Sequence, residues 1–409
     1  MNLIGIIILC AVIADFLLHF IADCLNLGKL DRHLPQIFAG WYDEERYAKS
    51  QEYLRVNTRF EWVAGLSNMG LFLLLWWGRG FPVIDQWVRS VSHVPVISGI
   101  LYIGVLFSEN GRCAPVFHVF TFNIEERFRV QQHHMVVFIT DRIKQLVLAA
   151  LIGGPLLAGV LAFFEYAGDH AWLYCWVVVV GFMIFMQFAV PAWIMPLFNK
   201  FKPLEAGELK TAIMNYARSI DFPIKKIFIM DGSRRSGKSN AFFSGFGRHK
   251  RIVLYDTLVK NHAPDELVAV LAHEMGHYKK NHVLWMLLAG IVQTGVMLYL
   301  LSLFISSPLL FEAFYMETTS VYAGLVFFGI LFAPIEFFMG IAMQYFSRKN
   351  EYAADRFAVE TTGKPGAFCP CPQKTCSSQP APSLTPHPCV ILNYSHPPVL
   401  QRLANLTAS

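Results

Sequence analysis

Long apolar runs separated by charged segments dominate the pattern of residues along this chain. Each run has roughly 17 residues or more, about the length that an α-helix needs to cross a membrane. The pattern predicts seven membrane spans, over residues 3–22, 62–78, 90–107, 143–165, 171–197, 283–305 and 321–346. The first run is not typical of a cleaved signal peptide, because no Lys or Arg precedes it. We therefore expect a mainly α-helical, multi-pass membrane protein.

The placement of Lys and Arg between these runs supports an odd number of spans. Basic residues are frequent in segments 23–60, 109–142 and 199–282, whereas segments 166–170 and 306–320 contain none. Because basic loops stay on the cytoplasmic side of a membrane, this alternation predicts a cytoplasmic C-terminus and a cytoplasmic loop at 199–282. The same distribution accounts for the net charge of +5 without a nucleic-acid partner.

Composition excludes an ordinary soluble enzyme, since hydrophobic residues make up 55% of the chain and charged residues only 15%, with a mean hydropathy of +0.42. The main soluble portion is the loop at 199–282. Its pattern predicts a helix at 205–220, followed by strands at 226–230, 240–243 and 251–255, the last two joined by a Gly-rich turn.

A complete H-E-x-x-H motif, residues 273–277, ends this loop. The preceding segment 264–271 has Pro and two acidic residues suited to a first helical turn, followed by an apolar stripe. On a helix His273 and His277 share one face and can bind one Zn²⁺. Glu274 is then placed to take a proton from zinc-bound water as the general base of a peptidase.

A catalytic zinc site has three protein ligands and one open position. The third candidate is Glu351, which follows the last span within a polar helix predicted at 347–360. Asp355 lies four residues further on, where it can accept a hydrogen bond from the free N–H of a ligand histidine. The residues therefore predict a metal site that joins the motif helix to the foot of the seventh span.

Further short motifs follow one another in order along the chain. They are Tyr42-Asp43-Glu44, Lys49-Ser50-Gln51, Ile124-Glu125-Glu126-Arg127-Phe128, Pro196-Leu197-Phe198-Asn199-Lys200-Phe201, Ser239-Asn240-Ala241-Phe242-Phe243, Gly245-Phe246-Gly247, Lys250-Arg251-Ile252-Val253-Leu254, and Tyr394-Ser395-His396-Pro397-Pro398 with Arg402. Together with the H-E-x-x-H motif and Glu351 to Asp355, they are similar to the CAAX prenyl protease 1 family of integral-membrane zinc metallopeptidases. The matching pieces are spread over most of the chain.

This resemblance implies a fold and a set of roles. The fold would be a ring of about seven helices around an internal chamber, with a small α/β zinc-peptidase portion at its cytoplasmic end. The metal ligands would be His273, His277 and Glu351, with Glu274 as general base and one zinc ion per chain. The remaining positions would serve substrate or support the metal: Asn240 and Ala241 in a strand beside an extended substrate, His396 and Arg402 binding substrate or its oxyanion, and Asp355 behind a ligand histidine.

These predictions divide the chain into four parts. Residues 1–198 would form the N-terminal transmembrane region with five spans, and 199–282 the cytoplasmic catalytic loop. Residues 283–346 would hold spans six and seven, and 347–409 a cytoplasmic C-terminal segment that carries the third ligand.

Two other hydrolase patterns compete with this interpretation. Residues 232–239 satisfy the P-loop pattern, but the sequence after them is not typical of the helix that a P-loop needs to hold phosphate. The segment up to His273 is also too short for an ATPase core, so we expect no nucleotide. An intramembrane protease of the site-2 type would need an Asp-Gly downstream of the histidines, whereas Asp231-Gly232 lies upstream.

A different class of function is a catalytically impaired family member that acts as a membrane scaffold or substrate-holding factor. Two stretches, 108–115 and 366–383, depart from the family pattern, and the prolines of the second cannot form the expected helix. Both spare the residues assigned to zinc, so we predict an active zinc endopeptidase.

The sequence leaves the physiological substrate open. The resemblance implies cleavage of prenylated C-termini in eukaryotes and membrane-protein quality control in bacteria. We expect a peptide or protein substrate, with or without a prenylated C-terminal Cys, and a lipid bilayer, but neither nucleic acid nor nucleotide. Because no dilysine retrieval signal follows Arg402, a bacterial inner membrane is favoured over the alternative, the endoplasmic reticulum membrane.

Overall fold

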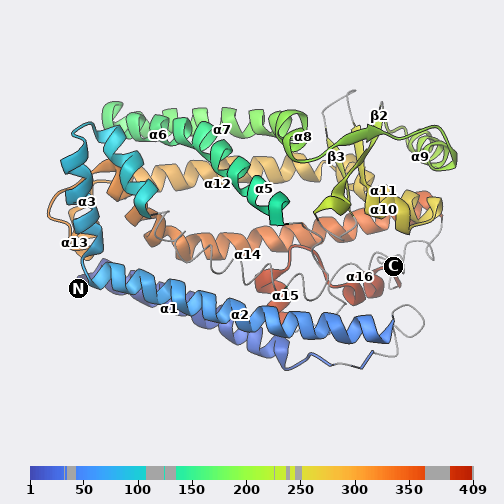
Figure 1. Ribbon diagram of the computed structural model, residues 1–409, viewed down its shortest axis with the longest axis horizontal. Helices are drawn as coiled ribbons and strands as arrows, with labels where there is room; N and C mark the ends of the chain where they lie inside the picture. The colour runs from blue at the N-terminus through green and yellow to red at the C-terminus, as the bar shows by residue number, and fades with distance from the viewer. Residues whose placement is uncertain are drawn as a thin grey trace.

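The computed structural model describes residues 1–31, 33, 34, 43–106, 124, 135–224, 226–235, 240–244, 251–363 and 387–407. Most long helices run along the length of an elongated molecule, and a small β-sheet with its own helices occupies one end (Figure 1). Several sequence motifs, among them 125–128 and 245–250, and both divergent stretches, 108–115 and 366–383, lie outside the described residues.

The helices account for most of the described chain. The longer ones are α1 (Leu3–Leu27), α2 (Glu44–Trp77), α5 (Met135–Leu148), α6 (Gly154–Tyr166), α7 (Ala171–Ala189), α12 (His282–Phe304) and α14 (Val321–Thr362). The shorter ones are α3 (Gly80–Val91), the helix Pro95–Leu106, α8 (Met195–Phe198), α9 (Glu208–Ser219), α10 (Asp256–Asn261), α11 (Pro264–Lys279), α13 (Pro308–Ala313), α15 (His387–Asn393) and α16 (Val399–Thr407). Wider π-helical turns at Ala149–Gly153 and Val190–Ile194 join α5 to α6 and α7 to α8.

Five helical segments among the described residues are long and apolar enough to cross a membrane. They are Leu3–Leu27, Val136–Tyr166, Gly168–Phe198, His282–Phe304 and Val321–Thr362. They correspond to five of the seven predicted spans. The predicted span 62–78 is the apolar second half of α2, whose first half is polar, and the span 90–107 contains only the shorter helix Pro95–Leu106. The count of seven therefore stays a prediction.

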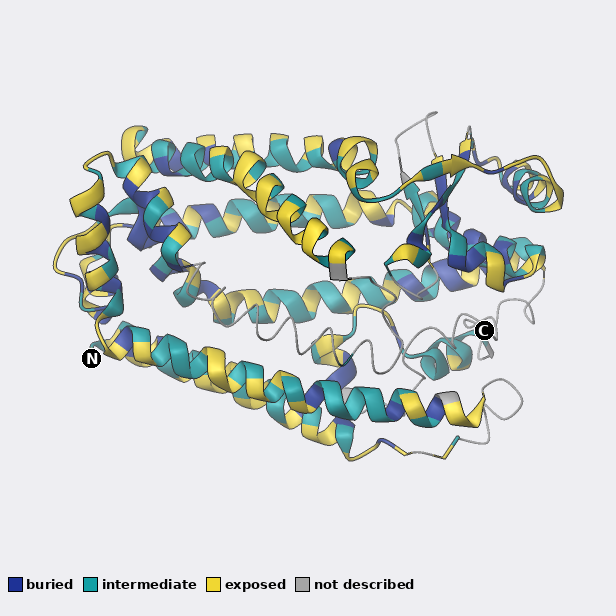
Figure 2. Ribbon diagram, viewed as in Figure 1, coloured by how far each residue is buried: buried dark blue, intermediate teal, exposed yellow. Residues whose placement is uncertain are grey.

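The spanning helices bury few of their own residues (Figure 2). Large apolar side chains such as Val136, Leu151 and Val177 lie exposed on them. A soluble protein rarely exposes this much contiguous apolar surface, whereas lipid tails cover it at no cost in solvation.

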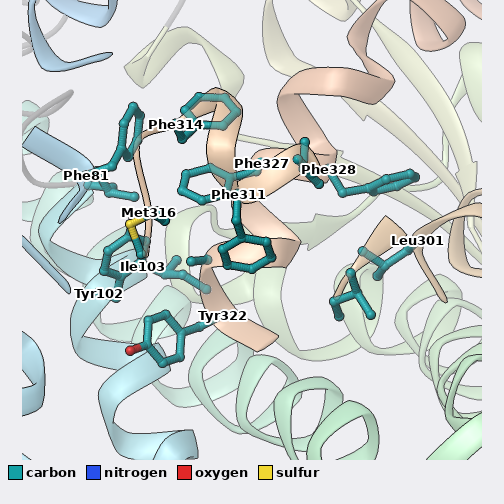
Figure 3. Close-up of a cluster of buried hydrophobic side chains, with 14 of the residues drawn as sticks. Phe81, Tyr102, Ile103, Leu301, Phe311, Phe314, Met316, Tyr322, Phe327 and Phe328 are labelled. Carbon is teal, nitrogen blue, oxygen red and sulfur yellow. The ribbon is translucent and has the colours of Figure 1, made fainter. Parts of the chain in front are cut away.

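An aromatic cluster holds the helices together at the end away from the sheet (Figure 3). The rings of Phe314 and Phe327 are stacked with centroids 4.0 Å apart, and Phe81 meets both rings edge-on. The Trp76 indole is fully buried here and donates a hydrogen bond of 2.7 Å to the carbonyl oxygen of Ala313. Rings in these arrangements combine large buried area with favourable edge and stacking contacts, so this cluster anchors α3 and α13 against the start of α14.

The sheet has four strands in the order β1-β2-β4-β3. Strand β1 (Phe201–Pro203) is antiparallel to β2 (Lys226–Met230), β2 is parallel to β4 (Arg251–Tyr255), and β4 is antiparallel to β3 (Ala241–Ser244). The three predicted strands are confirmed, whereas the three-residue β1 was not predicted. Strand β3 lies at an edge, so one side of its backbone is not paired within this sheet.

The motif helix α11 packs closely along the end of α14, and Gly276 lies at the contact. A Cβ atom at this position would lie 3.1 Å from Cδ1 of Phe357 and 3.2 Å from the backbone of Ala354. Both distances are shorter than ordinary van der Waals contacts, so the two backbones approach this closely because residue 276 has no side chain.

Replacing Gly276 with Leu is expected to push α11 away from α14. Overpacking of this kind costs about 1–3 kcal/mol, so the melting temperature of the purified protein should fall and metal binding should weaken. The matched control is Gly340→Leu on α14, where no neighbouring atom lies within 4 Å of a Cβ. Equal melting temperatures for the two variants would contradict the proposed role of this contact.

Candidate metal centre

Helix α11 begins where the sequence predicts, and its own residues stabilise the first turn. Pro264 lies in this turn, and the Glu266 carboxylate accepts the backbone N–H of Ala263 at 3.0 Å. Leu267 and Met275, eight residues apart, are fully buried. This buried stripe packs one face of the helix against the protein, while the two histidines of the motif share a different face.

Helix α14 brings the third candidate ligand to these histidines. The helix has 42 residues and would be ~60 Å long, about twice the thickness of the hydrocarbon core of a bilayer. The predicted span 321–346 and the predicted polar helix 347–360 are therefore one continuous helix. Its far end carries Glu351 and Asp355 on one face, both buried.

Three side chains converge between α11 and α14. The Nε2 atoms of His273 and His277 are 3.1 Å apart, and they lie 3.3 Å and 3.2 Å from the two carboxylate oxygens of Glu351. These residues form a group that could hold a metal ion. The ligand atoms of a tetrahedral zinc site with bonds of about 2.0–2.2 Å lie ~3.3–3.6 Å apart, so this spacing is close to that of a four-coordinate ion.

The charge of the cluster also favours a cation. Burial lowers the pKa of His273, but hydrogen bonding with Asp355 and Glu351 outweighs it and raises this pKa to about 9. Glu351 Oε2 is buried and has no well-oriented hydrogen-bond partner among the described residues. Two carboxylates that favour a proton on an imidazole also favour a divalent ion in its place. The donor set of two imidazoles and one carboxylate therefore fits a metal ion.

Asp355 lies next to the first histidine. Its Oδ1 is 2.8 Å from Nδ1 of His273, the ring nitrogen that faces away from Glu351. The same carboxylate receives two hydrogen bonds from the Arg402 guanidinium, from Nε at 2.8 Å and from Nη2. Asp355 is completely buried, and Arg402 is mostly buried. Arg402 thus contacts the carboxylate that orients His273, and a direct contact with substrate stays a prediction.

His396 approaches the centre from the segment between α15 and α16. Its Nδ1 is 3.0 Å from Oε1 of Glu351, and 68% of its side chain is exposed. The hydrogen bond to Glu351 raises the pKa of His396. An imidazole that touches a ligand and also faces outward can contact a bound peptide.

Asn240 and Ala241 lie at the start of the edge strand β3. The carbonyl oxygen of Asn240 accepts the backbone N–H of Tyr255 at 3.0 Å, and Ala241 pairs with Leu254. Strand β3 is therefore fixed on one side by β4, and it also contacts α11, the helix of the motif. This position is compatible with an extended substrate strand beside the metal centre.

Sequence reasoning did not predict a role for His282, which lies at the first residue of α12. Its Nδ1 is 3.0 Å from Nδ1 of His277. A tight bend after α11, with Asn281 in the left-handed conformation (φ 56°), returns the chain toward His277. If Nε2 of His277 faces the metal, its Nδ1 carries the hydrogen and donates a hydrogen bond to Nδ1 of His282. A partner of this kind orients a metal-bound imidazole. His282 lies five positions after His277, which is not a ligand spacing on one helix, so no local pattern indicated this contact.

Replacing His282 with Leu is expected to weaken metal binding about 10–100-fold, the usual cost of removing such a backing partner. His282→Asn, which keeps an acceptor, should recover part of the affinity. Competition with a chromophoric chelator would measure both. Unchanged affinity in His282→Leu would show that His282 only fills space.

The P-loop pattern does not have the structure of a nucleotide site in its described part. Gly232–Arg234 forms a single 3-10 turn, and the segment that follows the pattern is strand β3 rather than a helix. A P-loop requires a helix N-terminus at this point, so the described part of this segment does not have the structure that phosphate binding needs.

A peptidase motif beside a carboxylate, at the foot of helices of membrane length, defines a membrane-embedded metallopeptidase. A family model described as "CAAX prenyl protease N-terminal, five membrane helices" matches residues 24–200, and the model of peptidase family M48 matches residues 203–409. The chain therefore belongs to the CAAX prenyl protease 1 family of membrane metalloproteases.

Individual relatives match this chain over most of their length. The chain is 34% identical to CAAX prenyl protease 1 of Saccharomyces cerevisiae, over 80% of this chain and 78% of the relative. It is 32% identical to a CAAX prenyl protease 1 homolog of Dictyostelium discoideum, over 85% of each. The crystal structure of S. mikatae Ste24p has the same fold, with a TM-score of 0.91, 30% identity and 99% of each chain covered.

These matches show a multi-pass membrane metallopeptidase that acts on peptide or protein substrates. The relatives named above come from eukaryotes. The expected bacterial inner membrane is therefore not supported. The scaffold alternative also finds no support, because every residue assigned to the metal or to proton transfer is present and described.

Proposed function

We propose that this protein is a zinc endopeptidase whose ion is held by His273, His277 and Glu351. The observation that carries the proposal is the convergence of three ligand atoms at close to tetrahedral spacing between α11 and α14. Two imidazoles and one carboxylate form a ligand set found in zinc peptidases, which leaves a fourth position open.

Zinc, when bound, polarises a carbonyl and lowers the pKa of a coordinated water. Glu274 follows the first ligand in the chain and would take the proton from the attacking water and then give it to the leaving amine. Burial raises the pKa of the Glu274 carboxyl, although the nearby histidines oppose the shift. A carboxylate of raised pKa is a stronger base, which suits proton transfer near neutral pH.

The neighbouring residues would orient the ligands and the substrate. Asp355 fixes the ring of His273, and Arg402 holds Asp355 in place through its paired hydrogen bonds. His396, which is exposed beside Glu351, would bind the substrate or the oxyanion formed from its carbonyl. An extended peptide would add to the free edge of β3 beside Asn240 and Ala241 by backbone hydrogen bonds.

A cavity of about 390 Å³ next to the metal centre supports a lipid-modified substrate. His277 and His282 form one side of it, and apolar side chains of α7 and α12, among them Met183 and Met286, form another. Flexible, polarisable Met side chains adapt to irregular apolar groups. We infer that this cavity accepts the prenyl group of a C-terminal Cys, in a membrane of the endoplasmic reticulum.

Two measurements on the purified full chain test the proposal. Metal analysis should find about one zinc per chain, as a single His₂Glu site requires. A farnesylated peptide should be cleaved faster than its unprenylated twin, and Met286→Trp, which fills the cavity, should reduce that difference more than it slows the unprenylated peptide. Protein without zinc would refute the metal assignment, whereas equal rates on the two peptides would refute only the prenyl site.

A further inference from the structure

A second cavity, of about 280 Å³, lies where the membrane helices meet the sheet. Residues of α5 form one wall, and α8 with the segment leading into β1 forms another. It shares no lining residue with the cavity beside His277. The peptidase function proposed above does not use it.

The lining of this cavity is strongly basic. Four cations, Lys144, Lys200, Arg234 and Arg235, line it together with a single carboxylate, Asp141. This carboxylate pairs with the Arg235 guanidinium through contacts of 2.7 Å and 3.2 Å. The cavity therefore keeps an excess of positive charge.

The other cations are available to a ligand. The Lys144 ammonium donates one hydrogen bond, to the carbonyl oxygen of Leu197 at 2.8 Å. Lys200 and Arg234 are exposed, and neither side chain has a carboxylate partner among the described residues. The Asp231 carboxylate accepts the backbone N–H of Lys200 at 2.7 Å and does not line the cavity.

An apolar surface begins at the same place. Along α5 the side chains of Val136, Ile139, Ile143 and Leu146 recur every three or four residues, and they are 73%, 51%, 57% and 71% exposed. They form one stripe of a helix, and Figure 2 shows α5 exposed over much of its length. Trp193, 65% exposed, lies four residues before the cavity-lining Leu197, and Trp is enriched at membrane surfaces.

We propose that this cavity is a phosphate-ester site that binds the headgroup of an anionic phospholipid, with the acyl chains lying along the apolar stripe of α5. Ammonium and guanidinium groups bind phosphate oxygens by charge-assisted hydrogen bonds. The stripe distinguishes a phospholipid from free phosphate as the ligand. A lipid contacts both the cations and the stripe, whereas free phosphate contacts only the cations.

Native mass spectrometry of the detergent-purified full chain, titrated with dioleoylphosphatidylserine or dioleoylphosphatidylcholine, tests the proposal. The wild type should hold one phosphatidylserine more tightly than phosphatidylcholine. In K200Q/R234Q this affinity should fall about 25-fold, because each basic residue contributes about a 5-fold attraction to anionic lipid. The matched control is R218Q/K226Q, which removes the same two charges from exposed positions on α9 and β2 and should keep wild-type affinity.

Two further experiments test the same site without using these variants. Phosphatidylserine with a photoactivatable acyl chain should label α5 or the segment 193–198 of the wild type, and labelling confined to other helices would overturn the proposal. Inorganic phosphate should not displace the lipid at equal concentration, and full displacement would assign the site to free phosphate instead. Equal loss of affinity in the two double variants would also overturn it.

Discussion

Replacing Glu274 with Gln is expected to lower kcat for peptide cleavage about 1,000-fold, within the range of ~10²–10⁴ typical of general acid–base catalysis. The amide has nearly the shape of the carboxylate but cannot accept the proton of the attacking water. Because Glu274 is not among the three residues that converge as ligands, the metal content should stay near one ion per chain. Single-turnover cleavage and metal analysis of the same sample measure both quantities.

The matched control is Glu360→Gln, which removes an exposed carboxylate near the end of α14 and should leave kcat unchanged. If Glu274→Gln lost the metal as well as activity, Glu274 would support the ion and not proton transfer. If it kept substantial activity, another group would have to act as the base, and His396 would be the first to examine because it contacts Glu351.

Replacing Glu351 with Gln is expected to remove most of the bound metal. Loss of a backing partner alone costs about 10–100-fold in affinity, so the loss of a charged ligand should exceed 100-fold. Glu351 also carries the negative charge shared by His273, His277 and His396 at 3.0–3.3 Å. A neutral amide would remove this anionic partner from all three imidazoles and leave only Asp355 beside His273, and cleavage activity should disappear with the metal.

A graded comparison separates the ligand from its support. Asp355→Asn should weaken metal binding by the smaller amount expected of a backing partner, because Nδ1 of His273 would keep a hydrogen-bond acceptor. Chelator competition should therefore rank the wild type first, Asp355→Asn second and Glu351→Gln last. A reversed order of the two variants would mean that Asp355, and not Glu351, supplies the third ligand.

Much of this architecture is visible in local patterns. The five longest apolar helices, the three longer strands and the motif helix all lie where hydrophobic periodicity and turn residues predict them. The remaining spans are harder to predict, since α2 is polar in its first half and Pro95–Leu106 is short. A helix can extend beyond the membrane, or stop short of it, without a change in local pattern.

The supporting residues of the metal centre depend on contacts between distant parts of the chain. The Arg402 guanidinium comes within 3.4 Å of His273 from 129 residues away, and it also pairs with Asp355. Gly276 matters because α14 passes over it, and the motif itself accepts any residue at that position.

The sequence by itself determined the chemistry of this protein: two imidazoles and a base at helical spacing, a carboxylate at the foot of a span, and a surface suited to lipid. These features are local, because helical period and hydropathy depend on neighbouring residues. Only the tertiary structure decided how closely α11 approaches α14, that His282 lies 3.0 Å from His277, and that the cations of one cavity lie next to the apolar stripe of α5. Packing between helices that are far apart in the chain sets these contacts, and no local pattern encodes them.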